Sequence, residues 1–522
     1  MNRAFLKILA VVFFSTGLFA QTFTGHVTDS SGAAVAGASI TVHNQLTNVD
    51  TPSKTTDAGT YTAPYLRPGL YTLSAEMKGF KKQVRMDIAL DADSTVAEDF
   101  TLTIGAVGET VTVSADQVVV NTENASRSET FSSKTITEVP NNGRNIDMTA
   151  VLSTSVNFFD VNNGSITGTE TTNGAFGGGW FTMSVNGGQY AGAIVLMDGL
   201  PNDSAAGSGP ALQQTLTTAS MEAVQDFKVI ANAYDARYGN GSGGGFDTTI
   251  KTGTNTLHGS VYEFARRGWL NANPWVTDYY ANTPSASANP APQSSEDFYG
   301  FTLDGPVVIP HVYNGKNKTF FFIQYDEHKL KTPGTTTDSV PDCGTWNATG
   351  QACDFSNAST IGDFSQLYAL GPDGVSHVPI ILYDPLSGTP TNRNPFPGNI
   401  IPPCVGSTNR STTGGCCLNP VAMKILSYFP TPNVTPTAGT NPYNNNYFAP
   451  WTSNTTVRNV LAKFDENFSN ADRFSFRGSW YVNRNSFANL FGGTFFPGPA
   501  GNGEGGSSKG WSINPDWVHT FS

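Results

Sequence analysis

The chain has 522 residues, and only 13% of them are charged, with 29 Lys and Arg against 41 Asp and Glu. A typical soluble domain carries about 25% charged residues, so this composition excludes a helical cytosolic enzyme with Glu- and Lys-rich faces. The formal net charge of -12 argues against a nucleic-acid-binding protein, which needs a basic surface. With 54 Gly and 31 Pro, the composition favours turn-rich β structure, and the length predicts about three domains.

Residues 1–20, MNRAFLKILAVVFFSTGLFA, predict a secretory signal peptide. Its basic start contains Arg3 and Lys7, an apolar run follows, and the small residue Ala20 precedes the polar residue Gln21. A membrane anchor is the alternative, but it would need about 20 consecutive apolar residues. No later stretch approaches about 18 such residues, so any membrane role must rely on β-strands.

Residues 21–104 predict a small β-sandwich, because apolar and polar residues alternate around Ile40 and from Tyr71 to Met77, with turn residues between these runs. The residues of these strands and turns follow in the order Gly25, Val27, Asp29, Gly32, Val35, Gly37, Ala38, Thr56, Asp57, Gly59, Tyr61, Leu66, Pro68, Gly69, Tyr71, Gly79 and Phe80. This order resembles the carboxypeptidase-regulatory-like domain, a transthyretin-type sandwich. The resemblance implies an accessory module, since no nucleophile, base or metal set is present. Some relatives of that fold bind carbohydrate, but no sugar site is recognisable here.

Residues 105–254 begin with an alternating heptad, which consists of Glu109, Thr110, Val111, Thr112, Val113, Ser114 and Ala115. Taken alone, this alternation predicts an ordinary strand. However, a β-prone segment directly after an accessory module is well placed for capture by a partner that adds a strand. In this position the heptad resembles a TonB box. The resemblance implies a partner, the TonB-type energy transducer of the inner membrane.

Further motifs follow at Asn141–Asn145, Val185–Gly188, Val195–Gly199, Met221–Val229, Tyr234–Gly245 and Thr249–Asn255. Together they resemble the plug domain of TonB-dependent receptors, and the last two resemble the Oar-like branch, in which a sandwich domain precedes the plug. The candidate plug residues are Asn186, Gly187, Asp198, Gly199, Tyr234, Arg237, Tyr238 and Gly239. The alternatives are a simple turn at Asp198-Gly199 and a flexible linker at 239–245. A phosphate-binding loop is excluded, because no Gly-Lys-Ser/Thr follows.

Residues 255–522 contain strand-like runs of about ten residues, each with one apolar and one polar face. The runs lie at about 257–266, 298–309, 318–327, 458–468, 472–483 and 510–521. In the clearest run, 472–483, Phe474, Phe476 and Trp480 face one way, whereas Arg473 and Arg477 face the other. Such runs predict transmembrane strands at the start of a β-barrel, although a large soluble β-sandwich would alternate in the same way.

The connections between these runs favour the barrel, because long and short ones alternate: 267–297, 310–317, 328–457, 469–471 and 484–509. Outer-membrane barrels have short periplasmic turns and long outer loops. A soluble sandwich gives no reason for this alternation. Four aromatic residues near strand ends are candidates for girdles at the membrane interfaces, namely Trp269, Tyr481, Trp511 and Trp517.

All five cysteines fall in the long connection 328–457, at Cys343, Cys353, Cys404, Cys416 and Cys417. Export permits disulfides. Cys343 with Cys353 is the simplest pair, and Cys404 could pair with Cys416 or Cys417, which leaves one cysteine over. A zinc site is the weaker alternative, because no His cluster accompanies the cysteines.

The whole mature sequence therefore resembles a TonB-dependent outer-membrane receptor of the Oar-like type. The predicted fold class is mainly β, with a transthyretin-like sandwich, an α+β plug and the start of a transmembrane β-barrel. By that resemblance the barrel has about 22 strands, so we expect this chain to be an N-terminal fragment or the product of a truncated gene. No enzyme, metal or cofactor is expected, and the cluster Asp326-Glu327-His328 is expected to end a barrel strand.

The resemblance also implies how such a protein works. A ligand binds the outer loops and the upper face of the plug, and the transducer pulls on residues 109–115 from the periplasm and displaces the plug. The ligand class stays open between siderophore, oligosaccharide, peptide and protein. Outer-membrane lipid is a further expected partner, whereas nucleic acid is not. The alternatives are a surface adhesin and a secreted carbohydrate-binding protein, neither of which transports.

Overall fold

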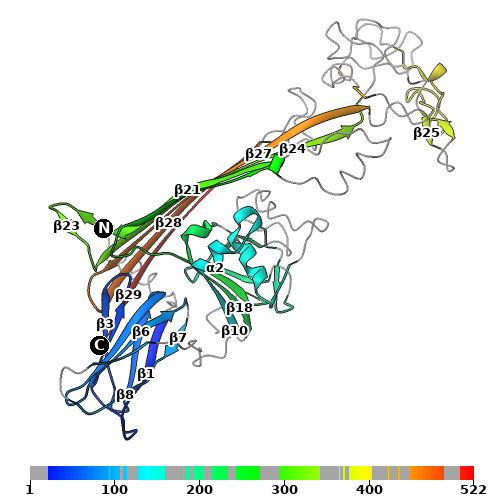
Figure 1. The fold of residues 1–522 in the computed structure, drawn as a ribbon. Helices are drawn as coiled ribbons and strands as arrows, with labels where there is room; N and C mark the ends of the chain where they lie inside the picture. Colours follow the sequence, from blue (N-terminus) through cyan, green and yellow to red (C-terminus); the bar gives the residue numbers. More distant parts are fainter. Residues whose placement is uncertain are drawn as a thin grey trace, which may run out of the picture.

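The computed structural model shows three β-rich parts in chain order, a sandwich, a plug and a long sheet that we call the wall (Figure 1). The structure describes residues 21–92, 94–105, 110–114, 127–158, 180–181, 183–188, 192–204, 213–215, 217–232, 241, 243–270, 294–340, 364, 368–370, 376–402, 421, 433–434, 446–486 and 506–521. The sandwich, in blue, lies at one end of the wall, and the plug, in cyan and green, lies against one side of it. Among the described residues, no helix combines the length and apolar character that crossing a membrane requires.

The sandwich consists of two packed sheets. Its strands are β1 (Gln21–Asp29), β2 (Ser39–Asn44), β3 (Val49–Lys54), β4 (Thr60–Leu66), β5 (Gly69–Glu76), β6 (Lys82–Leu90), β7 (Thr95–Ala97), β8 (Phe100–Leu102) and β9 (Thr110–Ser114). One sheet has the order β4-β1-β7, with β8 also paired to β1, and the other has the order β3-β2-β5-β6-β9. The predicted alternation is confirmed, because Ile40, Val42, Leu73 and Ala75 are all fully buried between the sheets.

The plug is built on a mixed sheet with the order β10 (Arg127–Ser132), β18 (Val224–Asn232), β19 (Gly245–Ile250), β14 (Ile194–Met197) and β15 (Leu200–Pro201). The other elements are α2 (Ser133–Glu138), η1 (Asn142–Arg144), η2 (Ile146–Leu152), β11 (Val156–Phe158), β12 (Trp180–Phe181), β13 (Met183–Val185), β16 (Asp203–Ser204), β17 (Gln213–Thr215) and η4 (Met221–Ala223). Ile136 of α2 packs with Phe227 and Phe246 of the sheet, and Phe322 and Leu461 of the wall belong to the same buried core. The plug and the wall therefore share apolar packing.

The wall is an antiparallel sheet of β20 (His258–Arg267), β21 (Ser295–Pro306), β24 (Thr319–Asp338), β27 (Tyr447–Asn467), β28 (Asp472–Ser486) and β29 (Ser507–His519), in that order. Smaller elements lie in its connections: η5 (Gly268–Leu270), β22 (Val308–Ile309), β23 (Tyr313–Asn314), β25 (Tyr368–Leu370), β26 (His377–Pro379) and η6 (Pro397–Asn399). Within the described residues β20 and β29 do not pair, so these six strands form an open sheet.

The face of the wall that points away from the plug carries a continuous apolar band. One row crosses all six strands in register, through Val261, Phe301, Tyr325, Val460, Trp480 and Trp511. Three further rows lie closer to the short turns. The first contains Leu303, Ile323 and Ile513, the second contains Phe321, Phe464 and Phe476, and the third contains Phe474 and Trp517. Rows two residues apart are separated by about 7 Å, so the band is about 20 Å tall, close to the roughly 25 Å of outer-membrane barrels.

The predicted pattern of connections is confirmed, since the segments between the wall strands are 268–294, 307–318, 339–446, 468–471 and 487–506. Two strand bounds differ from the prediction by more than three residues: β24 continues to Asp338 and β27 begins at Tyr447, and these two residues pair with each other. Backbone pairing continues beyond the apolar band, where no alternation marks it. The cluster Asp326-Glu327-His328 therefore lies inside β24, and the expectation that it ends a strand is wrong.

The candidate aromatic girdle is only partly compatible with the structure. Trp269, Trp511 and Trp517 are 71%, 73% and 60% exposed, as residues that face lipid would be. In contrast, Tyr481 is buried, because its position in β28 has the same parity as the plug-facing residue Arg477. The assignment of Tyr481 to a girdle is therefore wrong, and its neighbour Trp480 occupies the outer face.

Candidate functional site

The candidate TonB box forms the edge strand of the sandwich. Thr110–Ser114 are β9, which pairs in parallel with Lys82–Met86 of β6. Val111 is 43% exposed. Glu109 and Ala115, the two ends of the predicted heptad, lie outside the described residues. The strand expected from the alternation is therefore present, and its capture by a partner stays a prediction.

The candidate plug residues Asp198 and Gly199 form the tight turn between β14 and β15. Their φ angles are 50° and 72°, a region that Gly adopts readily and that Asp tolerates. The Asp198 carboxylate accepts a hydrogen bond from the backbone N–H of Ile250 at 2.9 Å. The backbone N–H of Gly199 donates to the Asp247 carboxylate at 3.2 Å. These bonds hold the turn against β19, so the simple turn that the sequence suggests is also a fixed point of the plug sheet.

The same carboxylate joins the plug to the wall. Lys463 Nζ lies 3.3 Å from Asp198 Oδ1, and Arg477 Nη1 lies 2.7 Å from Asp198 Oδ2. Burial alone would raise the pKa of Asp198, but the charges of Lys463 and Arg477 outweigh it and hold the pKa below its ordinary value. Asp198 is therefore ionised at neutral pH, and one plug carboxylate receives two cations from the plug-facing side of the wall.

A second pair of candidate residues, Asn186 and Gly187, forms the turn after β13. Their φ angles are 51° and 74°. Beside this turn the backbones of Gly188 and Gly243 meet, since a Cβ added at Gly188 would lie 2.5 Å from the Cα of Gly243. Glycine at positions 188 and 243 therefore allows a close approach of two backbones.

The remaining candidates lie outside the described residues. They are Tyr234, Arg237, Tyr238 and Gly239 of the plug motif, and the cysteines Cys343, Cys353, Cys404, Cys416 and Cys417. Their roles, including the disulfide pairing, stay predictions. In the described part of the chain, no group of three or more His, Cys, Asp or Glu residues has the arrangement of a metal site.

The sandwich also contacts the wall, at the end where the connections are short. Arg67 forms an ion pair with Asp465 at 2.5 Å, and the Asp465 side chain is fully buried. Arg473 donates to the backbone oxygen of Tyr65 and to the hydroxyl of Thr51, both at 2.6 Å. Sequence reasoning missed these contacts, because no local pattern marks a single Arg on a strand as the partner of a distant domain.

A third contact joins the sandwich to the plug. Lys228 is buried in the plug sheet, and its ammonium group donates to the backbone oxygen of Ala92 at 3.1 Å. Nearby, burial raises the pKa of Asp226 to about 7, with the carboxylates of Asp91 and Asp247 acting in the same direction. Asp226 and Asp247 are buried, whereas Asp91 is exposed, so this contact places two poorly solvated carboxylates close to a third.

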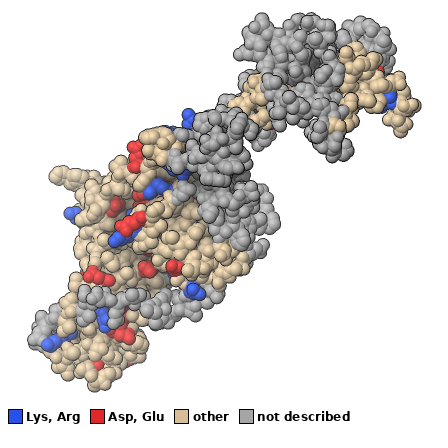
Figure 2. Space-filling view, turned by 45° about the vertical axis from the view of Figure 1, so that its right-hand side comes forward, with Lys and Arg blue, Asp and Glu red and all other residues tan. Residues whose placement is uncertain are grey.

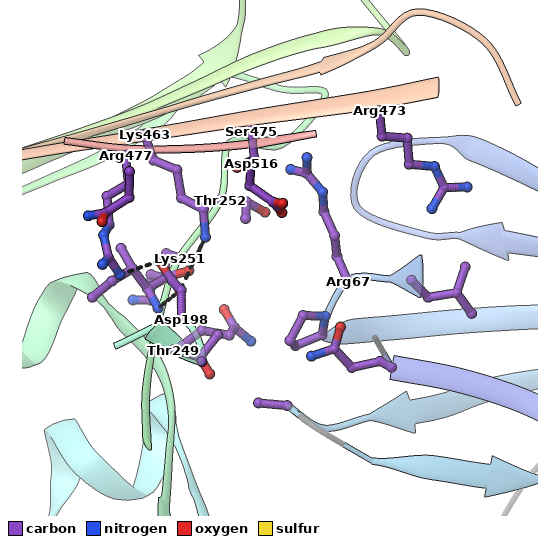
Figure 3. A pocket seen from close by; sticks show the side chains of 18 of the residues that line it. Arg67, Asp198, Thr249, Lys251, Thr252, Lys463, Arg473, Ser475, Arg477 and Asp516 are labelled. Carbon is purple, nitrogen blue, oxygen red and sulfur yellow. Dashed lines mark hydrogen bonds and ion pairs between the residues drawn. The ribbon is translucent and has the colours of Figure 1, made fainter. Parts of the chain in front are cut away.

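A cavity of about 310 Å³ lies where the three parts meet. Figure 3 shows Arg67 of the sandwich on one side, Asp198 of the plug with Lys463 and Arg477 on the other, and Asp516 of the wall between them. Its volume is at the lower limit of small-molecule pockets. Because all three parts supply its lining, a displacement of the plug or of the sandwich would change its shape.

A smaller cavity of about 90 Å³ lies between the plug and the wall, where residues of η1 and η4 face β20, β21, β24 and β27. Arg144 pairs there with Glu222 and also lies over the ring of Phe264, 3.6 Å from its centroid. His328 contacts Glu296 at 2.9 Å and stacks on Phe298. Asp326 and His328 thus line a plug–wall contact, whereas Glu327 pairs with Arg458 on the opposite face of the wall.

The surface agrees with the low charge of the sequence. On the face seen in Figure 2, Lys, Arg, Asp and Glu side chains occur in small groups of both signs among uncharged residues. Among the described residues on this face, basic side chains do not form an extended patch.

The comparisons agree with this architecture. Residues 249–522 match the family described as outer membrane beta barrel domain, and residues 22–103 match the carboxypeptidase regulatory-like domain. The chain therefore belongs to the outer-membrane β-barrel family, and its location is the outer membrane. The predicted resemblance is confirmed by a curated relative, the TonB-dependent transporter Oar of Myxococcus xanthus, which is 24% identical over 403 residues.

This alignment covers 74% of the chain but only 35% of Oar, so the chain spans about a third of the length of this relative. Among solved structures, the ferric enterobactin receptor of Pseudomonas aeruginosa matches with 11% identity and a TM-score of 0.31, covering 70% of this chain and 33% of the receptor. The outer membrane transporter YddB of Escherichia coli matches with 10% identity and a TM-score of 0.32, covering 75% and 44%. At these scores the two structures carry no argument about this chain.

Proposed function

We propose that this chain provides the sandwich, plug and first wall strands of a TonB-dependent receptor that takes up a ligand across the outer membrane with energy from an inner-membrane transducer. In this proposal residues 21–104 are the sandwich, residues 105–254 are the TonB box and plug, and residues 255–522 belong to the barrel. The protein acts as a transporter and not as an enzyme.

One observation carries the proposal: Asp198, in a turn of the plug sheet, is paired with Lys463 and Arg477 on the plug-facing side of the wall. A domain held in this way by side-chain contacts can close a barrel and still be released, since its release requires only that a few ion pairs break and one packed face separates. An adhesin has no need of a domain packed against the inner side of its wall. The heptad 109–115 precedes this domain on the same polypeptide, where a pull from the periplasm would reach it first.

Cysteine crosslinking in cells tests the coupling. Single cysteines replace Thr110, Val111, Thr112 and Val113 in turn, and a transducer with a cysteine in its periplasmic domain is produced in the same cells. We expect a disulfide-linked adduct for at least one of these positions, and none for a cysteine at the exposed position Leu46 on the sandwich surface. If the protein is in the outer membrane and no position forms an adduct, the coupling is refuted and an adhesin becomes the better explanation.

The ligand class is tested separately. Purified protein is screened by thermal shift against ferric siderophores, oligosaccharides and peptides, since a ligand that binds only the folded state raises the apparent stability. A class that raises the melting temperature is then tested for uptake in cells with and without an uncoupler. Uptake that continues at the same rate with the uncoupler would contradict energised transport.

A further inference from the structure

The position of β9 in the sandwich suggests how the box is presented. β9 is the last strand of the sheet β3-β2-β5-β6-β9, and each residue from Thr110 to Ser114 has a partner between Lys82 and Met86. One edge of β9 is therefore occupied by β6. Among the described residues, no strand pairs with its other edge.

The edge of β6 that pairs with β9 has a defined length. After Met86 the strand changes course, because Asp87 has a φ of 61° and the register with β5 shifts between Tyr71 and Leu73. Before Lys82 the backbone N–H of Lys81 is already bonded to the Thr103 oxygen at 2.9 Å. The straight edge of β6 thus accommodates a strand of about five residues, and Thr110–Ser114 fill it.

The two outer edges of this sheet differ in how they are protected. At the opposite edge, β3 contains Pro52, which has no N–H to offer, and its Thr51 hydroxyl is bonded to Arg473 of the wall. Proline and charged residues are common means by which proteins block an exposed edge. In contrast, Thr110–Ser114 contain no proline and no charge, and the Val111 side chain is exposed. The edge at β9 is chemically open to another strand.

Strand addition by the transducer is expected from the sequence, and we propose that β9 stays paired with β6 while this addition takes place at its outer edge. This inference rests on the proposed function, since it concerns the same segment and the same partner. The contact is made mainly by backbone N–H and C=O groups. A strand that β6 already orders presents these groups without the loss of conformational freedom that a free peptide would undergo on binding.

A disulfide between β6 and β9 tests two points in the full chain in outer membranes: that β9 is paired with β6, and that it stays paired when the transducer binds. Val84 and Thr112 are register partners in the parallel pair, so their side chains point to the same face. Adjacent strands lie about 4.8 Å apart, a spacing that permits a disulfide. The test variant is V84C/T112C, the single variants V84C and T112C are controls, and S74C/V84C places a disulfide between β5 and β6 without involving β9.

We expect V84C/T112C to form its disulfide in cells that lack the transducer, as identified by mass spectrometry of the linked peptides. We also expect the oxidised variant to bind the purified periplasmic domain of the transducer within about twofold of the unmodified chain. If export and membrane insertion are normal but the disulfide does not form, the sandwich does not hold the segment. If the disulfide forms and weakens binding more than about tenfold while S74C/V84C does not, the box must leave β6 to bind, and edge addition is refuted.

The outcomes also separate this inference from the function on which it rests. If the unmodified chain shows no binding to the transducer, the proposed function and the docking on β9 both fail. Formation of the disulfide would still show that the sandwich holds the segment. If the unmodified chain binds and only the locked variant fails, the proposed function stands and the edge addition alone is refuted.

Discussion

Asp198 and Arg477 are 279 residues apart in the sequence, and their side chains meet at 2.7 Å across the boundary between plug and wall. Asp198 lies in a turn whose backbone geometry suits Asp and Gly, and Arg477 lies on the strand face that points away from the apolar band. Lys463, on the neighbouring strand β27, contacts the same carboxylate. Two adjacent wall strands therefore converge on one residue of the plug.

Replacing this carboxylate should loosen the plug. Asp198→Asn keeps an acceptor for the N–H of Ile250 but leaves Lys463 and Arg477, which are 10% and 7% exposed, without their anion. An ion pair broken at a buried site destabilises by about 3 kcal/mol. Hydrogen–deuterium exchange in β14 and β19 should rise accordingly. Asp50→Asn, which removes an exposed partner of His43, is the matched control and should leave the plug unchanged. Unaltered exchange in Asp198→Asn would mean that apolar packing alone holds the plug.

The plug should lose stability as the pH rises from about 4 to about 7. The pKa of Asp226 is raised to about 7 from its ordinary value of 3.8, first by burial and then by Asp91 and Asp247. A pKa raised by folding means that the protonated form is favoured, so its contribution is complete below about pH 4 and is lost as the pH rises through about 7. Asp226→Asn should remove this dependence and stabilise β18 at pH 8, on the order of 1–4 kcal/mol.

Hydrogen–deuterium exchange in β18 at pH 5 and pH 8, corrected for the intrinsic rates, measures the effect. Asp147→Asn is the comparison variant for this exchange measurement. Burial alone raises the pKa of Asp147 to about 7, and this residue lies away from the contact between sandwich and plug. A wild-type chain whose β18 is equally protected at both pH values would contradict the prediction.

The wall strands and their connections could be predicted because period-two alternation is a local property. Phe474, Phe476 and Trp480 show the alternation within a few residues. The ends of β24 and β27 could not be predicted in this way, because apolar and polar residues do not alternate there. β24 ends with Thr335, Thr336, Thr337 and Asp338, and these pair with Pro450, Ala449, Phe448 and Tyr447 of β27. Strand pairing there depends on the neighbouring strand of the same chain and not on a local pattern.

The contacts between the three parts were not predictable for a related reason. Arg67 and Asp465 are ordinary surface residues in their own segments, and only the folded arrangement buries them together. The parallel pairing of β9 with β6 is equally invisible, because a strand of alternating Thr and Val could add to any open edge. The Asp198-Gly199 turn was recognisable from its dipeptide, whereas its two cationic partners were not.

Removal of Arg67 should release the sandwich from the wall. Arg67→Gln leaves the fully buried Asp465 with the hydroxyl of Ser475 but without this cation. We expect a loss of about 3 kcal/mol at this contact, seen as faster hydrogen–deuterium exchange in β4 and in the turn at 468–471. Lys82→Gln, which breaks the exposed pair with Glu76, is the matched control. If β4 exchanges at the same rate in both variants, the sandwich is held by its other contacts.

The approach of Gly188 to Gly243 should make the plug sensitive to a single methyl group. In Gly188→Ala the new Cβ would lie 2.5 Å from the Cα of Gly243 and 3.0 Å from the backbone oxygen of Val185, so backbone must move. Overpacking of this kind destabilises by about 1–3 kcal/mol, and we expect faster exchange in β13 and β19. Gly506→Ala is the control, because a Cβ there meets no atom within 4 Å. Equal exchange in the two variants would show that the 188 and 243 backbones separate freely, and that glycine is not required where they meet.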